Sequence, residues 1–196
     1  MFPLWVTFSK KVTMCNFKIE IYGTKSLDKY SETDKKGQER AIPILKELFK
    51  KCKEVTIQQH YQDKGGVDII VIATTHKGYT KKYAIECKDR YYKHTSFSRP
   101  YNETPAGWVI DEPKYNTMTN VSNEGYMPLY LNTFSDNTYY IWDVLNSNST
   151  YGKYVASKTT VEESEKIPKW GYFYTIEDYV VSGTIDPPTV EYPPLL

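Results

Sequence analysis

Apolar positions along the chain fall into several short strand-like segments and one longer segment with helical spacing. The helical spacing covers residues 34–53 and leaves the lysines of that segment mostly off the apolar face. The segments 17–23, 55–61, 67–74 and 81–90 predict strands, and short polar turns separate the last three. Because these three follow one another so closely, we expect an antiparallel meander, with segment 17–23 as an edge strand or an N-terminal addition.

Pro43 lies inside the predicted helix 34–53. Proline removes a backbone donor and crowds the carbonyl four residues earlier, which is that of Glu39. Two interpretations follow: the helix bends beside Glu39, or its regular part begins nearer residue 41.

The second half of the core predicts one more helix and a hairpin. Asp111, Glu112 and Pro113 are typical of a helix start, with the aspartate as the capping residue, and Gly125 is typical of a stop, so we expect a helix over 112–124. Segments 129–134 and 138–142 around a polar turn predict a β-hairpin. Together these elements predict an α/β fold with a mixed central sheet of about five strands flanked by helices.

Length and composition predict a single globular domain. The 196 residues are 40% hydrophobic and carry a net charge of +1. We expect a core at about 33–145, an N-terminal extension at 1–30 and a C-terminal addition at 146–196. That addition has strand-like pieces at 153–156 and 170–174, a turn of helix at 176–181 and a proline-rich end. Whether residues 1–13 belong to the functional chain is open, because Met14 is an alternative start.

Cysteine usage and the lack of a long apolar run favour a cytoplasmic protein without a membrane partner. Cys15, Cys52 and Cys87 cannot all pair and show no metal-type spacing. The apolar N-terminal run is too short to span a bilayer and lacks the basic lead-in of a secretory signal.

Charge divides unevenly along the chain. Residues 35–93 hold fourteen Lys or Arg and seven Asp or Glu, a net +7, whereas residues 101–196 hold five and thirteen, a net −8. A polyanion could be drawn to the basic half. The alternative is that these lysines only solvate the helix and the turns.

The basic half also holds the candidate chemistry. Glu86 and Lys88 are two residues apart on a predicted strand and therefore share a face, whereas Cys87 points to the opposite, apolar side as a buried structural cysteine. Asp68 lies at the start of the preceding strand. Two neighbouring carboxylates suit a hard cation such as Mg²⁺, and a lysine beside them suits a water or a phosphate.

The pattern Asp68, then Glu86-Cys87-Lys88 after a strand–turn–strand, resembles the PD-(D/E)xK phosphodiesterase superfamily, which includes restriction endonucleases and Holliday-junction resolvases. The resemblance covers roughly residues 33–145, and Val67 stands where many members have proline. It implies a restriction-endonuclease-like core and a Mg²⁺- or Mn²⁺-dependent endonuclease that acts by in-line attack of a metal-activated water, with DNA favoured as the substrate and RNA left as the alternative. It also leaves a homodimer open.

The resemblance assigns roles to individual residues. Asp68 and Glu86 are expected to bind the metal with the backbone carbonyl of Cys87, and Lys88 to orient the attacking water. Glu39, on the helix before the first strand, is expected to take a second metal or a metal-bound water. Lys114 matches the lysine or glutamine that relatives often direct toward the site from the following helix, with a solvated lysine as the alternative.

The segment 91–110 is expected to be an irregular loop directly after the Glu-x-Lys strand. It carries Lys93, His94 and Arg99, which we expect, with Lys114, to contact nucleic acid. A packed surface loop with aromatic anchors is the alternative.

Other chemistries lack support in the sequence. The histidines and cysteines do not group at zinc spacing, and no Gly-x-Ser-x-Gly motif occurs. Two non-enzymatic hypotheses stay open. One is a binding module for nucleic acid or protein on the same fold, and the other is an inhibitor or assembly protein that uses its acidic C-terminal half.

Overall fold

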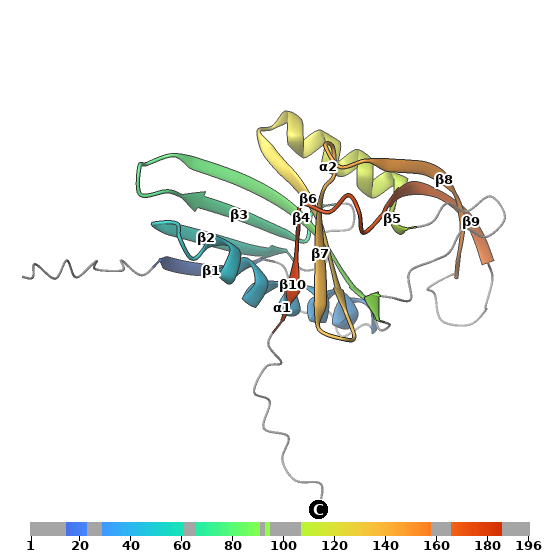
Figure 1. The fold of residues 1–196 in the computed structure, drawn as a ribbon, viewed down its shortest axis with the longest axis horizontal. Helices are drawn as coiled ribbons and strands as arrows, with labels where there is room; N and C mark the ends of the chain where they lie inside the picture. Colours follow the sequence, from blue (N-terminus) through green and yellow to red (C-terminus); the bar gives the residue numbers. More distant parts are fainter. Residues whose placement is uncertain are drawn as a thin grey trace, which may run out of the picture.

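A seven-stranded mixed sheet organises the chain in the computed structural model, which describes residues 15–22, 29–60, 66–90, 93–94, 107–157 and 166–185. Its strand order is β1-β2-β3-β4-β6-β7-β10 (Figure 1). The strands are β1 (Asn16–Tyr22), β2 (Glu54–His60), β3 (Ile69–Thr74), β4 (Thr80–Arg90), β6 (Tyr126–Phe134), β7 (Thr138–Asp143) and β10 (Val181–Thr184).

Strand directions confirm the predicted meander and hairpin. β2, β3 and β4 pair antiparallel in succession, and β6 pairs antiparallel with β7. β4 and β6 run parallel, as do β1 and β2, so the sheet is mixed. The sheet has seven strands rather than about five because β1 adds to one edge and β10 to the other.

A second sheet of three strands, in the order β5-β9-β8, forms from segments far apart in sequence. Its strands are β5 (Trp108–Asp111), β8 (Ser149–Ser157) and β9 (Lys166–Tyr174). β5 was not predicted, since residues 91–110 were expected to be irregular throughout. The predicted turn of helix at 176–181 is also wrong, because residues 176–180 form turns and bends and β10 begins at Val181.

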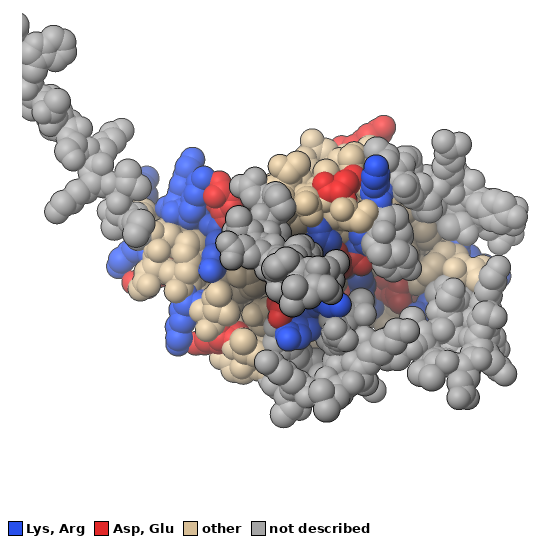
Figure 2. Space-filling model, turned by 90° about the horizontal axis from the view of Figure 1, so that it is seen from below, with Lys and Arg blue, Asp and Glu red and all other residues tan. Residues whose placement is uncertain are grey.

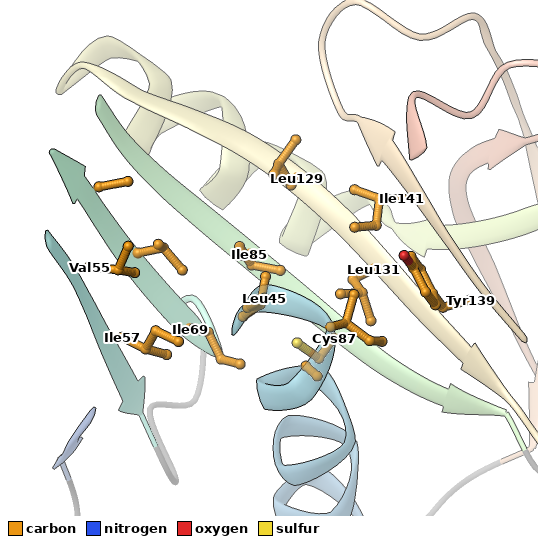
Figure 3. Packing of buried hydrophobic residues seen from close by; sticks show 14 of the residues in the cluster. Leu45, Val55, Ile57, Ile69, Ile85, Cys87, Leu129, Leu131, Tyr139 and Ile141 are labelled. Carbon is orange, nitrogen blue, oxygen red and sulfur yellow. The ribbon is translucent and has the colours of Figure 1, made fainter. Parts of the chain in front are cut away.

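Helix α1 (Lys29–Phe49) covers one face of the large sheet. Its side chains Ala41, Ile44 and Leu45 are buried against alternate residues of the strands, among them Ile85 and Cys87 (Figure 3). The helix begins and ends earlier than the predicted 34–53. It is continuous through the exposed Pro43, so a start near residue 41 is wrong.

Helix α2 (Glu112–Asn123) lies over the other face, mainly above β6, and the small sheet packs on the same side (Figure 1). This side has its own buried cluster, which includes Met118, Tyr130 and Trp142. Asp111 is the N-cap residue by position, but its side chain makes no capping hydrogen bond and binds Tyr154 and Lys169 instead. Neither described helix is long and apolar enough to cross a membrane.

Candidate active site

The first carboxylate of the candidate site lies where β3 begins. Ile69 and Ile85 form the last pair of the β3–β4 ladder. Asp68 comes just before that pair, and there its side chain, rather than a backbone carbonyl, accepts the hydrogen bond from β4. Its Oδ2 accepts a hydrogen bond of 2.7 Å from the backbone N–H of Cys87. This bond ties Asp68 to the middle of the Glu86-Cys87-Lys88 segment, so the two parts of the sequence motif are in contact.

Glu86 is the second carboxylate, and its side chain is 1% exposed. Its Oε1 lies 3.3 Å from the ammonium of Lys88, and its Oε2 lies 2.9 Å from the ammonium of Lys114 on α2. Lys114 also donates a 2.6 Å hydrogen bond to the Gly66 carbonyl just before β3. Lys114 therefore points toward the site, as expected, and contacts Glu86.

The sheet places these groups on the α2 side. Ile70 pairs with Ala84 and Glu86 pairs with Tyr130, so Asp68, Glu86 and Lys88 share the face that also carries Ala84 and Tyr130. Cys87 lies on the opposite face in the core under α1, as predicted. Burial raises the pKa of the Cys87 thiol well above its ordinary value.

Burial and the neighbouring Glu86 raise the pKa of Asp68 to about 8. The two lysines and the Cys87 N–H oppose that increase only in part. Burial alone lowers the pKa of Lys114, but the carboxylates of Glu86 and Asp68 outweigh it and raise that pKa overall. The site therefore holds an Asp68 carboxyl whose ionisation is opposed by burial and by Glu86, beside a lysine that stays charged.

Glu39 is not brought to this cluster. It lies on α1 with its carboxylate 54% exposed and 3.5 Å from the ammonium of Lys35. The preceding residue, Gln38, is the buried one, and its Nε2 donates to the His60 carbonyl at 2.8 Å. His60 in turn donates its N–H to the Asp68 carbonyl at 2.8 Å. Gln38 thus supports the backbone around Asp68. It is the residue before Glu39, to which the resemblance assigned a role in the site.

Arg90 and Asn132 extend the same face and were missed by the sequence analysis. Arg90 Nε donates to Asn132 Oδ1 at 2.7 Å, and its guanidinium reaches the Tyr130 hydroxyl at 2.6 Å. Arg90 was detectable, because it follows Lys88 by two residues on one strand. Asn132 was not, because only the β4–β6 register places it opposite Lys88.

The expected nucleic-acid contacts are only partly described. Lys93 is exposed, whereas His94 binds Asp136, with its Nδ1 2.7 Å from Oδ2. Arg99 and most of the loop 91–110 lie outside the described residues.

Comparison with protein-family models, curated proteins and solved structures finds no match to this chain. Among the described residues, no group of three or more His, Cys, Asp or Glu side chains is arranged to hold a metal ion. The predicted donor set, which is Asp68, Glu86 and the Cys87 carbonyl, has only two carboxylates and stays a prediction. That set suits Mg²⁺, which commonly keeps several waters and takes only one or two carboxylates from the protein.

Proposed function

We propose that this protein is a metal-dependent nuclease that hydrolyses phosphodiester bonds, with DNA as the first substrate class to test. The observation that carries the proposal is the buried Glu86 between Lys88 and Lys114, next to Asp68 on the adjacent strand. Asp68, Glu86 and Lys88 also match the Asp…Glu-x-Lys pattern on which the resemblance to the PD-(D/E)xK superfamily rests.

Asp68, Glu86 and the Cys87 carbonyl are the groups that would hold Mg²⁺ or Mn²⁺. The residues fit such an ion because the raised pKa of Asp68 reports repulsion from Glu86 as well as burial, and a divalent cation relieves that repulsion. When bound, the ion lowers the pKa of water and neutralises charge on the phosphate.

The two lysines have different positions and therefore different proposed roles. Lys88 has a side chain 43% exposed, so it can reach a water or a phosphate oxygen while it stays near Glu86. Lys114 is 21% exposed and bound to both Glu86 and Gly66, so it positions Glu86 and the start of β3. We assign Glu39 no part in this proposal, because its carboxylate faces Lys35.

The test is cleavage of plasmid, branched, single-stranded and RNA substrates with Mg²⁺ or Mn²⁺. Asp68→Asn and Glu86→Gln should each lower the rate at least about 100-fold, since both remove a charged oxygen ligand. Glu54→Gln is the matched control, because Glu54 is an exposed glutamate at the start of β2, paired with Lys53. Equal rates for wild type and Asp68→Asn on every substrate would refute the proposal.

A non-catalytic binding module is the second candidate. The observation in its favour is that both oxygens of Glu86 already lie within ion-pair distance of a lysine and that Asp68 accepts a backbone N–H, so these carboxylates have charged or polar partners without a metal. Nucleic-acid binding without metal that survives Asp68→Asn and Lys88→Ala, with no cleavage, would favour this candidate.

A further inference from the structure

The face of the sheet that carries Asp68 and Glu86 continues across β2 to β1. Tyr22 pairs with His60 in the β1–β2 register, and Gln58 pairs with Ile70 in the β2–β3 register. Side chains of Tyr22, His60 and Asp68 therefore point to one side of the sheet. α2 lies above the central strands, and no described helix lies over this side of β1–β3 (Figure 1).

An aromatic pair lies on this part of the face, which no described helix covers. The rings of Tyr22 and His60 stack with centroids 5.0 Å apart and planes 11° apart, and Tyr22 is 44% exposed. The pair is joined to the candidate site through the backbone, because the His60 N–H donates to the Asp68 carbonyl. With adjacent strands about 4.8 Å apart, His60 lies two strands, or roughly 10 Å, from Glu86.

A polar network fixes the Tyr22 ring in place. The Tyr22 hydroxyl donates to Glu20 Oε2 at 2.7 Å, and Gln58 Nε2 donates to the same oxygen at 2.9 Å. Hydrogen bonds from Lys18, Tyr22 and Gln58 lower the pKa of Glu20 to about 2, so this acceptor stays charged at neutral pH. The ring is thus held ready before any ligand arrives, which reduces the entropy lost on binding.

We infer that Tyr22, backed by His60, stacks on an unpaired base of the nucleic acid beside the cleaved bond. This inference rests on the proposed function and deepens it, because it names the substrate class as single-stranded or locally unpaired nucleic acid. Both faces of a base inside a duplex are covered by its neighbours, so only an unpaired base can lie on the tyrosine ring.

The charge of this region suits such a ligand. His60, Asp68 and Lys88 all belong to residues 35–93, which carry a net +7. Figure 2 looks at the molecule from below, on the side away from α2, and shows Lys and Arg side chains at the end near β1. The net positive charge of residues 35–93, to which His60 belongs, attracts a phosphate backbone to this half of the chain.

The experiment is a binding titration in EDTA, where no metal-dependent cleavage occurs. The probes are labelled single-stranded DNA, the same sequence as RNA, and a blunt duplex. The wild type should bind at least one single strand more tightly than the duplex. Tyr22→Ala should weaken that binding at least about fivefold, and Tyr22→Phe, which keeps the ring, should stay close to wild type. Tyr79→Ala is the matched control, because Tyr79 is 70% exposed in the β3–β4 turn at the other end of these strands.

A series of oligonucleotides with one abasic position tests the contact from the ligand side. One of the abasic oligonucleotides, the one that lacks the stacked base, should bind the wild type more weakly than the intact strand does. The same oligonucleotide should bind Tyr22→Ala as tightly as the intact strand binds this variant. If Tyr22→Ala binds single strands as the wild type does, or if the two losses add at every position, the inference is wrong. Tyr22-dependent binding without cleavage would leave it standing and refute only the proposed hydrolysis.

Discussion

At the residue scale, the contacts of Glu86 set the chemistry of the candidate site. This carboxylate is buried between two ammonium groups, and one of them comes from a helix that follows it by some 26 residues in sequence. A buried carboxylate is tolerated only while such partners remain, because desolvation of an unpaired charge is costly.

Loss of Lys114 should therefore destabilise the fold. Lys114→Met removes the partner at 2.9 Å from Glu86 and should lower the free energy of unfolding by about 3 kcal/mol, measured by urea denaturation. Lys169→Met is the control, because the Lys169–Asp111 pair is nearly half exposed and should contribute about 1 kcal/mol or less. Adding Glu86→Gln should restore part of the loss, and an unchanged stability of Lys114→Met would contradict this account.

Asp68 should make stability fall as pH rises. Its pKa in the folded chain is about 8, against an ordinary value of 3.8, so the folded state binds the proton more tightly. Below about pH 4 both states are protonated, and the contribution is fully present. Between about pH 4 and 8 the unfolded state has lost its proton, and stability decreases by up to about 1.4 kcal/mol per pH unit. Urea titrations across this range should show a flatter profile for Asp68→Asn, and parallel profiles would exclude this role for Asp68.

At the scale of elements, two glycines show how closely packed backbones restrict the sequence. A Cβ on Gly171 of β9 would lie 2.6 Å from the Ile110 carbonyl oxygen of β5, whereas a Cβ on Gly37 of α1 would meet the Asp89 Cβ at an ordinary 3.6 Å. Gly171 therefore allows β5 and β9 to pair closely, and Gly37 has room for a methyl group.

Alanine at these two positions should have opposite effects. Gly171→Ala should destabilise the protein by about 1–3 kcal/mol, because β5 must move away from β9. Gly37→Ala should stabilise it by about 0.5–1 kcal/mol, since alanine favours the helix. Thermal unfolding of the two variants measures both changes, and a stable Gly171→Ala would mean that β5 is not held against β9 in this way.

At the scale of the whole molecule, metal binding should be coupled to pH and to stability. Mg²⁺ needs both carboxylates ionised, so it should stabilise the protein more at pH 8 than at pH 6. At a concentration 100-fold above its dissociation constant, the gain should be about 2.7 kcal/mol. Thermal unfolding with and without Mg²⁺ measures this, and Glu86→Gln should abolish the gain. The same gain in that variant would locate the ion elsewhere.

Much of the large sheet could be predicted from local pattern. Alternation along residues 81–90 separated Glu86 and Lys88 from Cys87, because side chains of a strand alternate between faces whatever the surroundings. The turns between β2, β3 and β4 are short enough to force antiparallel neighbours. By contrast, the small sheet was not predicted. The four residues of β5 are too few to show a strand pattern, and β5 pairs with β9, which follows it by some 60 residues.

The sequence by itself determined which residues of β3 and β4 share a face, since alternation is a property of the backbone. Only the tertiary structure decided which distant groups lie next to these residues. Lys114 contacts Glu86, Gln38 rather than Glu39 supports the backbone beside Asp68, and Tyr22 stacks on His60. The placement of α2 and the parallel register of β1 are set by packing across the whole fold, and no local pattern in the chain encodes them.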